Sequence, residues 1–160
     1  MSPQHAFVER ALASDRQAVV ELFSEDLADL HLPVDAEALG QVFDQLVGDQ
    51  RSVVLVVRTA PGRPASGVTV ASRVPSVKFS GWSLWIEELY VGKATRQRGL
   101  GRLLVEHLLH IARSEQLRGI DLEAYHGNAP AALLYRSLGF RRLGRERFYY
   151  RMDWDLEDEA

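Results

Sequence analysis

A short stretch of the sequence has the residue types that bind a pyrophosphate group. It lies between an expected strand and an expected helix, and it consists of Arg96, Gln97, Arg98, Gly99, Leu100, Gly101 and Arg102. Glycines let a bulky anion approach the backbone, and a helix start offers unpaired N–H groups and the positive end of the helix dipole. Lys93 adds a further positive charge. We therefore predict a phosphate-binding turn, with a solvated basic turn that only reverses the chain as the alternative.

Two common phosphate-binding motifs do not fit this turn. A P-loop requires Ser or Thr after a Gly-Lys pair, and none follows here. A dinucleotide fingerprint requires a third glycine at position 104, where the chain has Leu104. The turn therefore belongs to another class of phosphate site.

Two adjacent carboxylates, Glu87 and Glu88, lie in the middle of an expected strand, Trp82–Val91. Apolar side chains alternate up to Ile86, and the alternation resumes at Leu89 one position out of phase. A regular strand cannot keep both sets on one face. A β-bulge at the two glutamates restores the pattern by inserting one residue, and it carries a carboxylate into the middle of the sheet. The alternative is a strand buried on both faces, with both carboxylates reaching solvent at an edge.

The elements around these two features predict a mixed sheet with helices on both faces. Periodicity, caps and turn residues give the order strand, helix, helix, three strands, helix, strand, helix, two strands. A strand–helix–strand crossover follows the early hairpins and implies a parallel pair. The expected strands are residues 6–12, 52–58, 67–73, 82–91, 120–125, 140–143 and 148–152. The expected helices run from Asp15 to Pro33, around Leu39, from Gly99 to Ser114 and from Asn128 to Gly139.

The composition excludes several classes of protein. The chain has 160 residues, which suit one domain, and 46% of them are hydrophobic. A net charge of −3 argues against a general nucleic-acid binder, and the absence of cysteine excludes a disulfide framework and a thiol nucleophile. Glu9 and Arg10 interrupt the N-terminal apolar stretch, and no run reaches the roughly 20 apolar residues of a membrane span. We expect a cytoplasmic protein without a metal or a membrane segment.

The turn resembles the Arg/Gln-x-x-Gly-x-Gly/Ala signature of the GNAT superfamily of N-acetyltransferases. Leu84–Val91 is similar to that family's fourth strand, and Asn128–Phe140 to its late Asn…Tyr…Gly-Phe segment. The resemblance covers about residues 50–152, while the N-terminal third agrees only in element order. It implies a mixed α/β fold with a largely antiparallel seven-stranded sheet, about four helices on its two faces, and a splayed central strand pair.

The same resemblance sets the expected domain organisation. We expect one N-acetyltransferase domain over residues 1–160, with the cofactor-binding core at about 82–140. Residues 154–160 are expected to be a tail.

The reaction implied by the resemblance is transfer of an acetyl group from acetyl-CoA to a primary amine, by direct attack in a ternary complex. A lysine-like amine has a pKa of about 10.4, so only about 1 in 2,500 molecules is neutral at pH 7. A positioned base offsets part of this cost. We favour Glu87 over Glu88, because Ile86–Val91 is also similar to polyamine-type members of the family. Glu123 and His126 are the alternative bases.

The resemblance also assigns residues to the cofactor. It places Tyr135 beside the cofactor sulfur as a general acid, although an apolar helix stripe is also a usual place for a core tyrosine. It adds a cofactor contact to Asn128, which is expected to cap a helix. The splayed strand would hold the pantetheine arm and offer N–H groups to the oxyanion. The residues expected to bind the cofactor are Leu89, Tyr90, Val91, Arg96, Gln97, Arg98, Gly99, Leu100, Gly101, Arg102, Asn128, Ala131 and Tyr135.

Acidic residues gather where the first expected helix ends, a region that covers the acceptor pocket in the family. A pocket lined by carboxylates suits a small cationic amine, and the alternative is a solvated acidic helix face. The residues expected to bind the acceptor are Asp26, Asp29, His31, Glu87 and Tyr90, with Glu25 beside them.

Three other functions stay open. A non-catalytic acyl-CoA-binding module would bind the cofactor without forming product, and another acetyltransferase would act on a protein amino group. Aromatic residues near the C-terminus favour an interface, most simply that of a homodimer. The sequence leaves open the acceptor amine and the length of the donor acyl chain.

Overall fold

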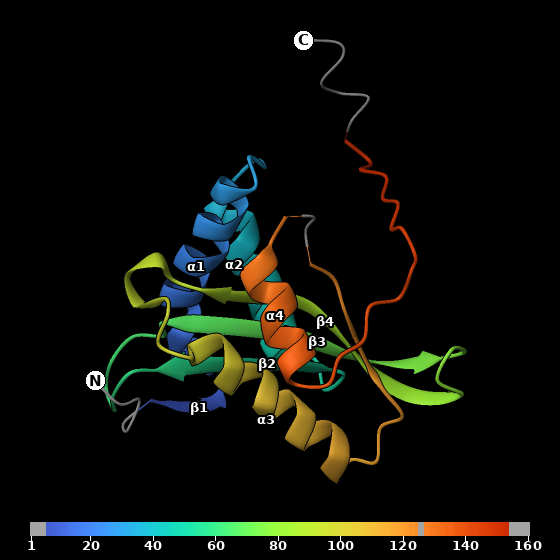
Figure 1. Ribbon diagram of the computed structural model, residues 1–160. Coiled ribbons are helices and arrows are strands. Elements are labelled where there is room, and N and C mark those ends of the chain that lie inside the picture. The colour runs from blue at the N-terminus through green and yellow to red at the C-terminus, as the bar shows by residue number, and fades with distance from the viewer. Residues whose placement is uncertain (1–5, 125–126, 154–160) are drawn as a thin grey trace. The chain divides into compact units, whose positions relative to one another are not determined.

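The computed structural model describes residues 6–124 and 127–153, which fall into two compact units, residues 1–127 and 128–160. The predicted organisation as one domain therefore stays a prediction, and the predicted tail at 154–160 lies outside the described residues. The first unit contains β1 (Phe7–Arg10), η1 (Ala13–Asp15), α1 (Arg16–Asp29), α2 (Ala36–Gly48), β2 (Ser52–Arg58), β3 (Gly67–Ser76), β4 (Gly81–Val91), η2 (Lys93–Thr95), α3 (Leu100–Ser114) and β5 (Ile120–Leu122) (Figure 1). The second unit contains α4 (Ala129–Ser137).

The sheet of the first unit is mixed and largely antiparallel, as predicted. Its order is β1-β2-β3-β4-β5, with antiparallel neighbours except for the parallel pair β4 and β5. The right-handed crossover expected for such a pair contains α3. The described residues include four α-helices, which also matches the prediction.

The predicted seven-stranded sheet is wrong, because the sheet has five strands in the described part of the chain. Residues 140–143 and 148–152, predicted as closing strands, form no strand. Strand propensity measures how well side chains fit a pleated, half-buried surface. These stretches lack that surface, since Leu143, Phe148 and Met152 are 51%, 86% and 88% exposed.

Alternating side chains of β2 build two separate cores, one on each face of the sheet. Val54 and Val56 belong to the core under α1 and α2, whereas Val53, Leu55 and Val57 belong to the core under α3. Successive side chains of a strand point to opposite faces, so a strand buried on both faces is apolar at every position. The helices thus cover both faces of the sheet, with α1 and α2 on one side and α3 on the other (Figure 1).

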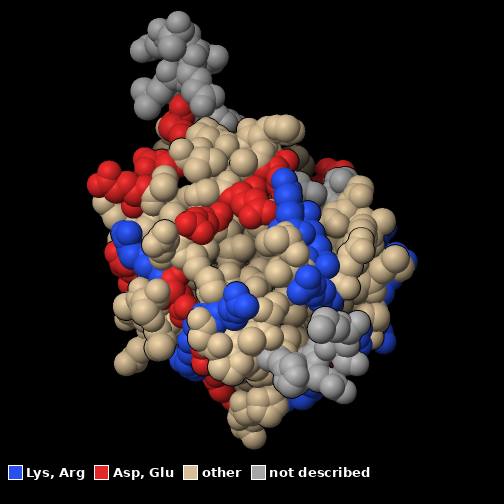
Figure 2. All heavy atoms as spheres, turned by 90° about the vertical axis from the view of Figure 1, so that its left-hand side faces the viewer, with Lys and Arg blue, Asp and Glu red and all other residues tan. Residues whose placement is uncertain are grey.

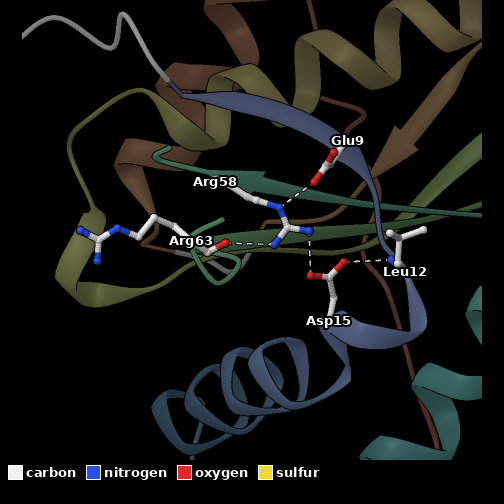
Figure 3. Close-up of polar contacts among 5 residues, drawn as sticks. All are labelled: Glu9, Leu12, Asp15, Arg58 and Arg63. Atoms are coloured by element: carbon white, nitrogen blue, oxygen red, sulfur yellow. Dashed lines mark hydrogen bonds and ion pairs between the residues drawn. The ribbon is translucent and has the colours of Figure 1, made fainter. Parts of the chain in front are cut away.

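A buried ion-pair network fixes the start of α1 against the sheet (Figure 3). Arg58 at the end of β2 donates to Asp15 Oδ1 at 2.7 Å, to Glu9 Oε1 at 2.6 Å and to the Arg63 carbonyl at 3.2 Å. The other Asp15 oxygen accepts the Leu12 N–H at 2.9 Å. Asp15 was predicted to open the helix, and it does precede α1, but its side chain bonds outside the helix.

We expect Asp15→Asn to lower the free energy of unfolding by about 2 kcal/mol. The amide keeps the shape but not the charge, so the Arg58 guanidinium, whose side chain is 11% exposed, loses its most buried anion. Urea unfolding followed by circular dichroism measures the difference. Asp44→Asn is the matched control, because that carboxylate pairs with Arg16 at the surface and its loss should cost less than about 1 kcal/mol. Equal losses in the two variants would contradict the prediction.

Candidate active site

The bulge predicted in the central strand is present. In the pairing of β3 with β4, Val70 lies opposite Glu88 and Ala71 opposite Ile86, so Glu87 is the inserted residue. The fully buried Thr69 hydroxyl donates to the Glu88 carbonyl at 2.8 Å and supports the irregular backbone. Sequence reasoning missed Thr69, although a single polar residue within the apolar run Val68–Ala71 was a usable signal.

The bulge decides which glutamate faces the interior. Leu84 before the bulge and Leu89 after it both pack on the α3 side, while Tyr90 packs on the α1 side. Glu88 therefore shares the α1 side with Tyr90, two positions away. Glu88 is half-buried and Glu87 is exposed. The structure thus turns inward the glutamate that sequence reasoning ranked second, and the role of Glu87 stays a prediction.

Glu88 forms a hydrogen bond with Asp26 on α1. Two carboxyl groups need a proton between them to form such a bond, and Glu88 holds it. Burial is the largest cause that raises the pKa of Glu88, to about 9, and the hydrogen bond and charge of Asp26 and the charge of Glu87 add to it. The Leu89 N–H, which donates to the carboxylate, opposes the rise. At neutral pH the unliganded protein therefore carries a neutral acid at Glu88.

A second set of contacts joins the end of α1 to β4 and η2. We call Asp29, Tyr90, Lys93 and Arg96 the Asp29 cluster. The Asp29 carboxylate pairs with Lys93 Nζ at 2.6 Å and with Arg96 Nη2 at 3.5 Å, and it accepts the Tyr90 hydroxyl at 3.1 Å. Glu25, one turn earlier on α1, accepts the Lys93 N–H at 3.0 Å.

These contacts shift two pKa values in opposite directions. The hydrogen bond from Lys93 is the main cause that lowers the pKa of Asp29. Burial is the main cause that raises the pKa of the Tyr90 hydroxyl, and its hydrogen bonds to Glu25 and Asp29 raise it further. At neutral pH the cluster therefore contains an ionised Asp29 and a protonated Tyr90. Figure 2 shows acidic side chains directly beside basic ones on one face of the molecule.

The end of α1 corrects one prediction and explains His31. The Leu32 N–H donates to the Leu27 carbonyl at 2.9 Å, and the His31 N–H donates to the Ala28 carbonyl at 3.1 Å. These are the two bonds of a Schellman motif, and His31 takes its left-handed position with φ 57°. The helix therefore ends before Pro33 because its carbonyls are capped by the following backbone. His31 is exposed at this stop, and its predicted acceptor contact stays a prediction.

The predicted phosphate-binding turn has the backbone geometry of an anion site. Gly99 is the N-cap of α3 with φ 74°, and Gln97 has φ 63°. No side chain in the described part of the chain caps α3, and its first turn contains no acidic residue. A Cβ at Gly99 would meet no atom within 4 Å, so the space over the helix start is open. Left-handed residues and free helix N–H groups together form a concave anion site, so the residues present fit a pyrophosphate.

The central strands separate beside this turn. β4 and β5 pair over three residues each, from Leu84 and Ile120 to Ile86 and Leu122. In the described residues, positions 88–91 of β4 pair with β3 alone. The predicted strand to Tyr125 is shorter, since β5 ends at Leu122. Of the alternative bases, Glu123 is exposed just beyond β5, and His126 lies outside the described residues.

The second unit confirms the predicted cap and stop of its helix. The Asn128 side chain accepts the Ala131 N–H at 3.3 Å, and Gly139 has φ 94°. The Phe140 N–H donates to the Tyr135 carbonyl at 3.0 Å, which completes a Schellman motif. The rings of Tyr135 and Phe140 lie 5.9 Å apart, the apolar contact typical of that motif. Tyr135 thus has a structural role at the helix end as well as its predicted catalytic one.

The described part of the chain contains neither a metal-ligand cluster nor a membrane-spanning helix. Over residues 6–124 and 127–153, no three His, Asp, Glu or Cys side chains gather as metal ligands. In the same residues, no helix has the length and apolar character needed to cross a membrane.

The chain belongs to the acetyltransferase (GNAT) family, whose model matches residues 16–140. An N-alpha-acetyltransferase, RimI, of Mycobacterium tuberculosis is 34% identical over 87 residues, which are 54% of this chain and 50% of that protein. A streptothricin acetyltransferase of Streptomyces lavendulae is 35% identical over 77 residues, 47% of this chain and 41% of that one. The matches thus span about half or less of these relatives.

The fold also matches solved structures at low identity. A structure described as a transcriptional regulator from Bacillus halodurans aligns with a TM-score of 0.80 and 20% identity, over 92% of this chain and all of the other. At that identity the likeness concerns the fold alone, which does not determine function.

Proposed function

We propose that this protein is an N-acetyltransferase that transfers an acetyl group from acetyl-CoA to a primary amine. One observation carries the proposal: the bulge turns Glu88 inward on the strand that precedes η2 and the glycine-rich start of α3, a helix start that no side chain of the described residues caps. Family membership supports acetyl-CoA as the donor. Glu88 and the turn lie eight to fourteen residues apart on one strand–turn–helix segment. A base and an anion site held close together are what acyl transfer from a CoA thioester requires.

The cofactor would be held by the turn and by the part of β4 that follows its pairing with β5. Arg96, Arg98 and Arg102 supply positive charge, and the backbone from Gln97 to Gly101 supplies N–H donors. Leu89, Tyr90 and Val91 would bind the pantetheine arm through their backbone, because this part of β4 has no β5 partner in the described residues. The cofactor supplies an activated acetyl group. Asn128, Ala131 and Tyr135 are proposed as its contacts on α4.

Glu88 is proposed as the base, in preference to Glu87. Its carboxylate would take one proton from the ammonium group, so that the neutral amine nitrogen can bond to the acetyl carbon as the carbon–sulfur bond breaks. The Tyr135 hydroxyl would donate a proton to the thiolate that is released, and the second proton of the amine nitrogen would replace the one that Tyr135 gave. In the unliganded protein the pKa of Glu88, about 9, keeps this carboxyl neutral. A cationic amine at the site would lower that pKa, because an opposite charge stabilises the carboxylate.

A small cationic amine is the proposed acceptor. Glu25, Asp26 and Asp29 on α1 contact β4 and η2, so their carboxylates gather on the side of the sheet that Glu88 faces. An acceptor that is an antibiotic or other small amine is in keeping with the streptothricin acetyltransferase, and a protein α-amino group with the N-alpha-acetyltransferase. The carboxylates favour the small cation. Cytoplasmic location and a homodimer stay predictions.

The test measures thiol release from acetyl-CoA over three pools: di- and polyamines, neutral-side-chain amino acids, and peptides with a free α-amino group. We expect the polyamine pool to give a kcat/KM at least about tenfold above the others, because each paired charge contributes roughly 1 kcal/mol or more once desolvated. Asp26→Asn should raise KM for that pool more than it lowers kcat, and Asp44→Asn should change neither. Thiol release with the peptide pool alone would contradict a small-molecule acceptor and indicate a protein α-amino group as the acceptor. CoA binding without release from any pool would indicate a non-catalytic module.

A further inference from the structure

Asp29 presents one carboxylate to two cations that flank the phosphate-binding turn. Lys93 Nζ lies 2.6 Å from Oδ1, and Arg96 Nη2 lies 3.5 Å from Oδ2. The lowered pKa of Asp29, caused mainly by Lys93, keeps this carboxylate ionised at neutral pH. The side chains of Asp29 and Lys93 are 31% and 59% exposed, so solvent and ligands can reach the pair.

Arg96 is held in place by two further contacts. Its Nε donates to the Val91 carbonyl at 3.1 Å, and its guanidinium lies 5.2 Å from the centre of the Tyr90 ring. The Tyr90 hydroxyl in turn donates to Asp29. Arg96 thus lies on the aromatic face with its end toward Asp29, although it is the first residue of the turn proposed to bind the pyrophosphate.

We infer that the Asp29 carboxylate is an internal competitor of the pyrophosphate: it holds Lys93 and Arg96 in the unliganded protein and loses them to the cofactor phosphates on binding. The inference rests on the proposed function, since it requires CoA at this turn. Both cations favour whichever anion is nearer and more highly charged, and a pyrophosphate carries more charge than one carboxylate. Exposed ion pairs stabilise little, so breaking the pairs of Asp29 with Lys93 and Arg96 costs little free energy.

The exchange has a consequence for the acceptor side of the site. Asp29 lies one turn after Glu25 and Asp26 on α1, and losing its cations leaves these carboxylates with a more negative potential. Filling the cofactor turn would therefore strengthen the attraction for a cationic amine. Asp29 acts through Lys93 and Arg96, so it is a positioning residue.

Isothermal titration calorimetry with CoA and with 3′-dephospho-CoA tests the inference. We expect Asp29→Asn to bind both ligands about three- to tenfold more tightly, which corresponds to about 0.7–1.4 kcal/mol. The unliganded variant should also have a lower Tm than the wild type, because it has lost two ion pairs. A residue that only supports the structure would lower Tm and weaken binding together, so the opposite directions of the two changes distinguish the roles.

Asp44→Asn is the matched control, with the same change of charge on α2 away from the turn, and it should leave CoA affinity within about twofold. Unchanged or weaker CoA binding by Asp29→Asn would overturn the inference and leave the proposed function in place. If Asp29→Asn bound CoA more tightly but not 3′-dephospho-CoA, the inference would also be overturned. The Asp29 carboxylate would then compete with the 3′-phosphate and not with the pyrophosphate. No CoA binding by the wild type would overturn the proposed function and the inference together.

Discussion

Glu88→Gln is expected to lower kcat/KM for the preferred amine by about 10²–10⁴-fold, the usual contribution of a positioned base. Glutamine has the shape of the protonated carboxyl, and it can keep the hydrogen bond to Asp26 that Glu88 makes in the unliganded protein. It cannot accept a proton from the amine. Thiol release from acetyl-CoA at saturating donor measures the loss. Glu87→Gln is the control one residue away, at the exposed bulge position, and should cost less than about fivefold.

The pH profile distinguishes a base from a residue that only binds the substrate. Productive encounter requires an ionised Glu88 with a cationic amine, so kcat/KM should rise with pH up to about 9, the pKa of Glu88 in the free protein. It should fall again near about 10.4, where the amine loses its proton. The Glu88→Gln profile should have no limb near pH 9. Its kcat/KM should instead rise steadily up to the pKa of the amine, because only the neutral amine can then react. A wild-type profile without a limb near pH 9, or similar losses in the two glutamate variants, would refute Glu88 as base.

The same pKa gives a stability control. Because the folded-state pKa of Glu88 is raised from 4.5 to about 9, the native state holds this proton more tightly than the unfolded chain. Its contribution to stability is therefore complete below about pH 4.5 and is lost as pH rises toward 9. Glu88→Gln removes this loss, so at pH 8 the variant should resist urea at least as well as the wild type. A lower stability would mean that the loss of activity reflects unfolding.

The sequence predicted the central feature of the site because a bulge leaves a local trace. The phase of apolar residues changes between Ile86 and Leu89, and the structure inserts Glu87 at that point. The sequence did not show that Glu88, and not Glu87, faces the interior. A phase change locates the bulge to two residues, but the inserted one is fixed by pairing with Val70 and Ala71 on β3. Pairing partners are not encoded in the strand itself.

Contacts between residues far apart in the sequence could not be predicted from local sequence patterns. The turn around Gly99 was predicted from glycines and flanking elements, all within ten residues. By contrast, Asp29 and Lys93 meet only because α1 packs across the sheet, and sequence reasoning assigned them to the acceptor and the cofactor separately. The stop of α1 at His31 shows the same limit. A left-handed histidine carries no signal comparable to glycine, so the sequence pattern predicts the end of the helix at Pro33 instead.

Tyr135→Phe is expected to lower kcat by about 10²-fold while changing KM for acetyl-CoA by less than about threefold, since the hydroxyl is proposed to protonate only the departing sulfur. Phenylalanine keeps the ring contact with Phe140 at 5.9 Å and the backbone bonds that end α4. The substitution therefore separates the chemical role of the hydroxyl from the structural role of the ring. Steady-state kinetics at saturating amine gives both constants.

Tyr135→Leu serves as the structural comparison, because it removes ring and hydroxyl together and weakens the apolar contact of the Schellman motif. If the hydroxyl is the acid, the two variants should lose similar kcat, and the Leu variant alone should lose Tm. If the ring only supports the helix end, Tyr135→Phe should turn over at the wild-type rate and Tyr135→Leu should be the slower enzyme. That second pattern would leave the departing sulfur to be protonated by solvent and would remove Tyr135 from the mechanism, without affecting Glu88 or the cofactor turn.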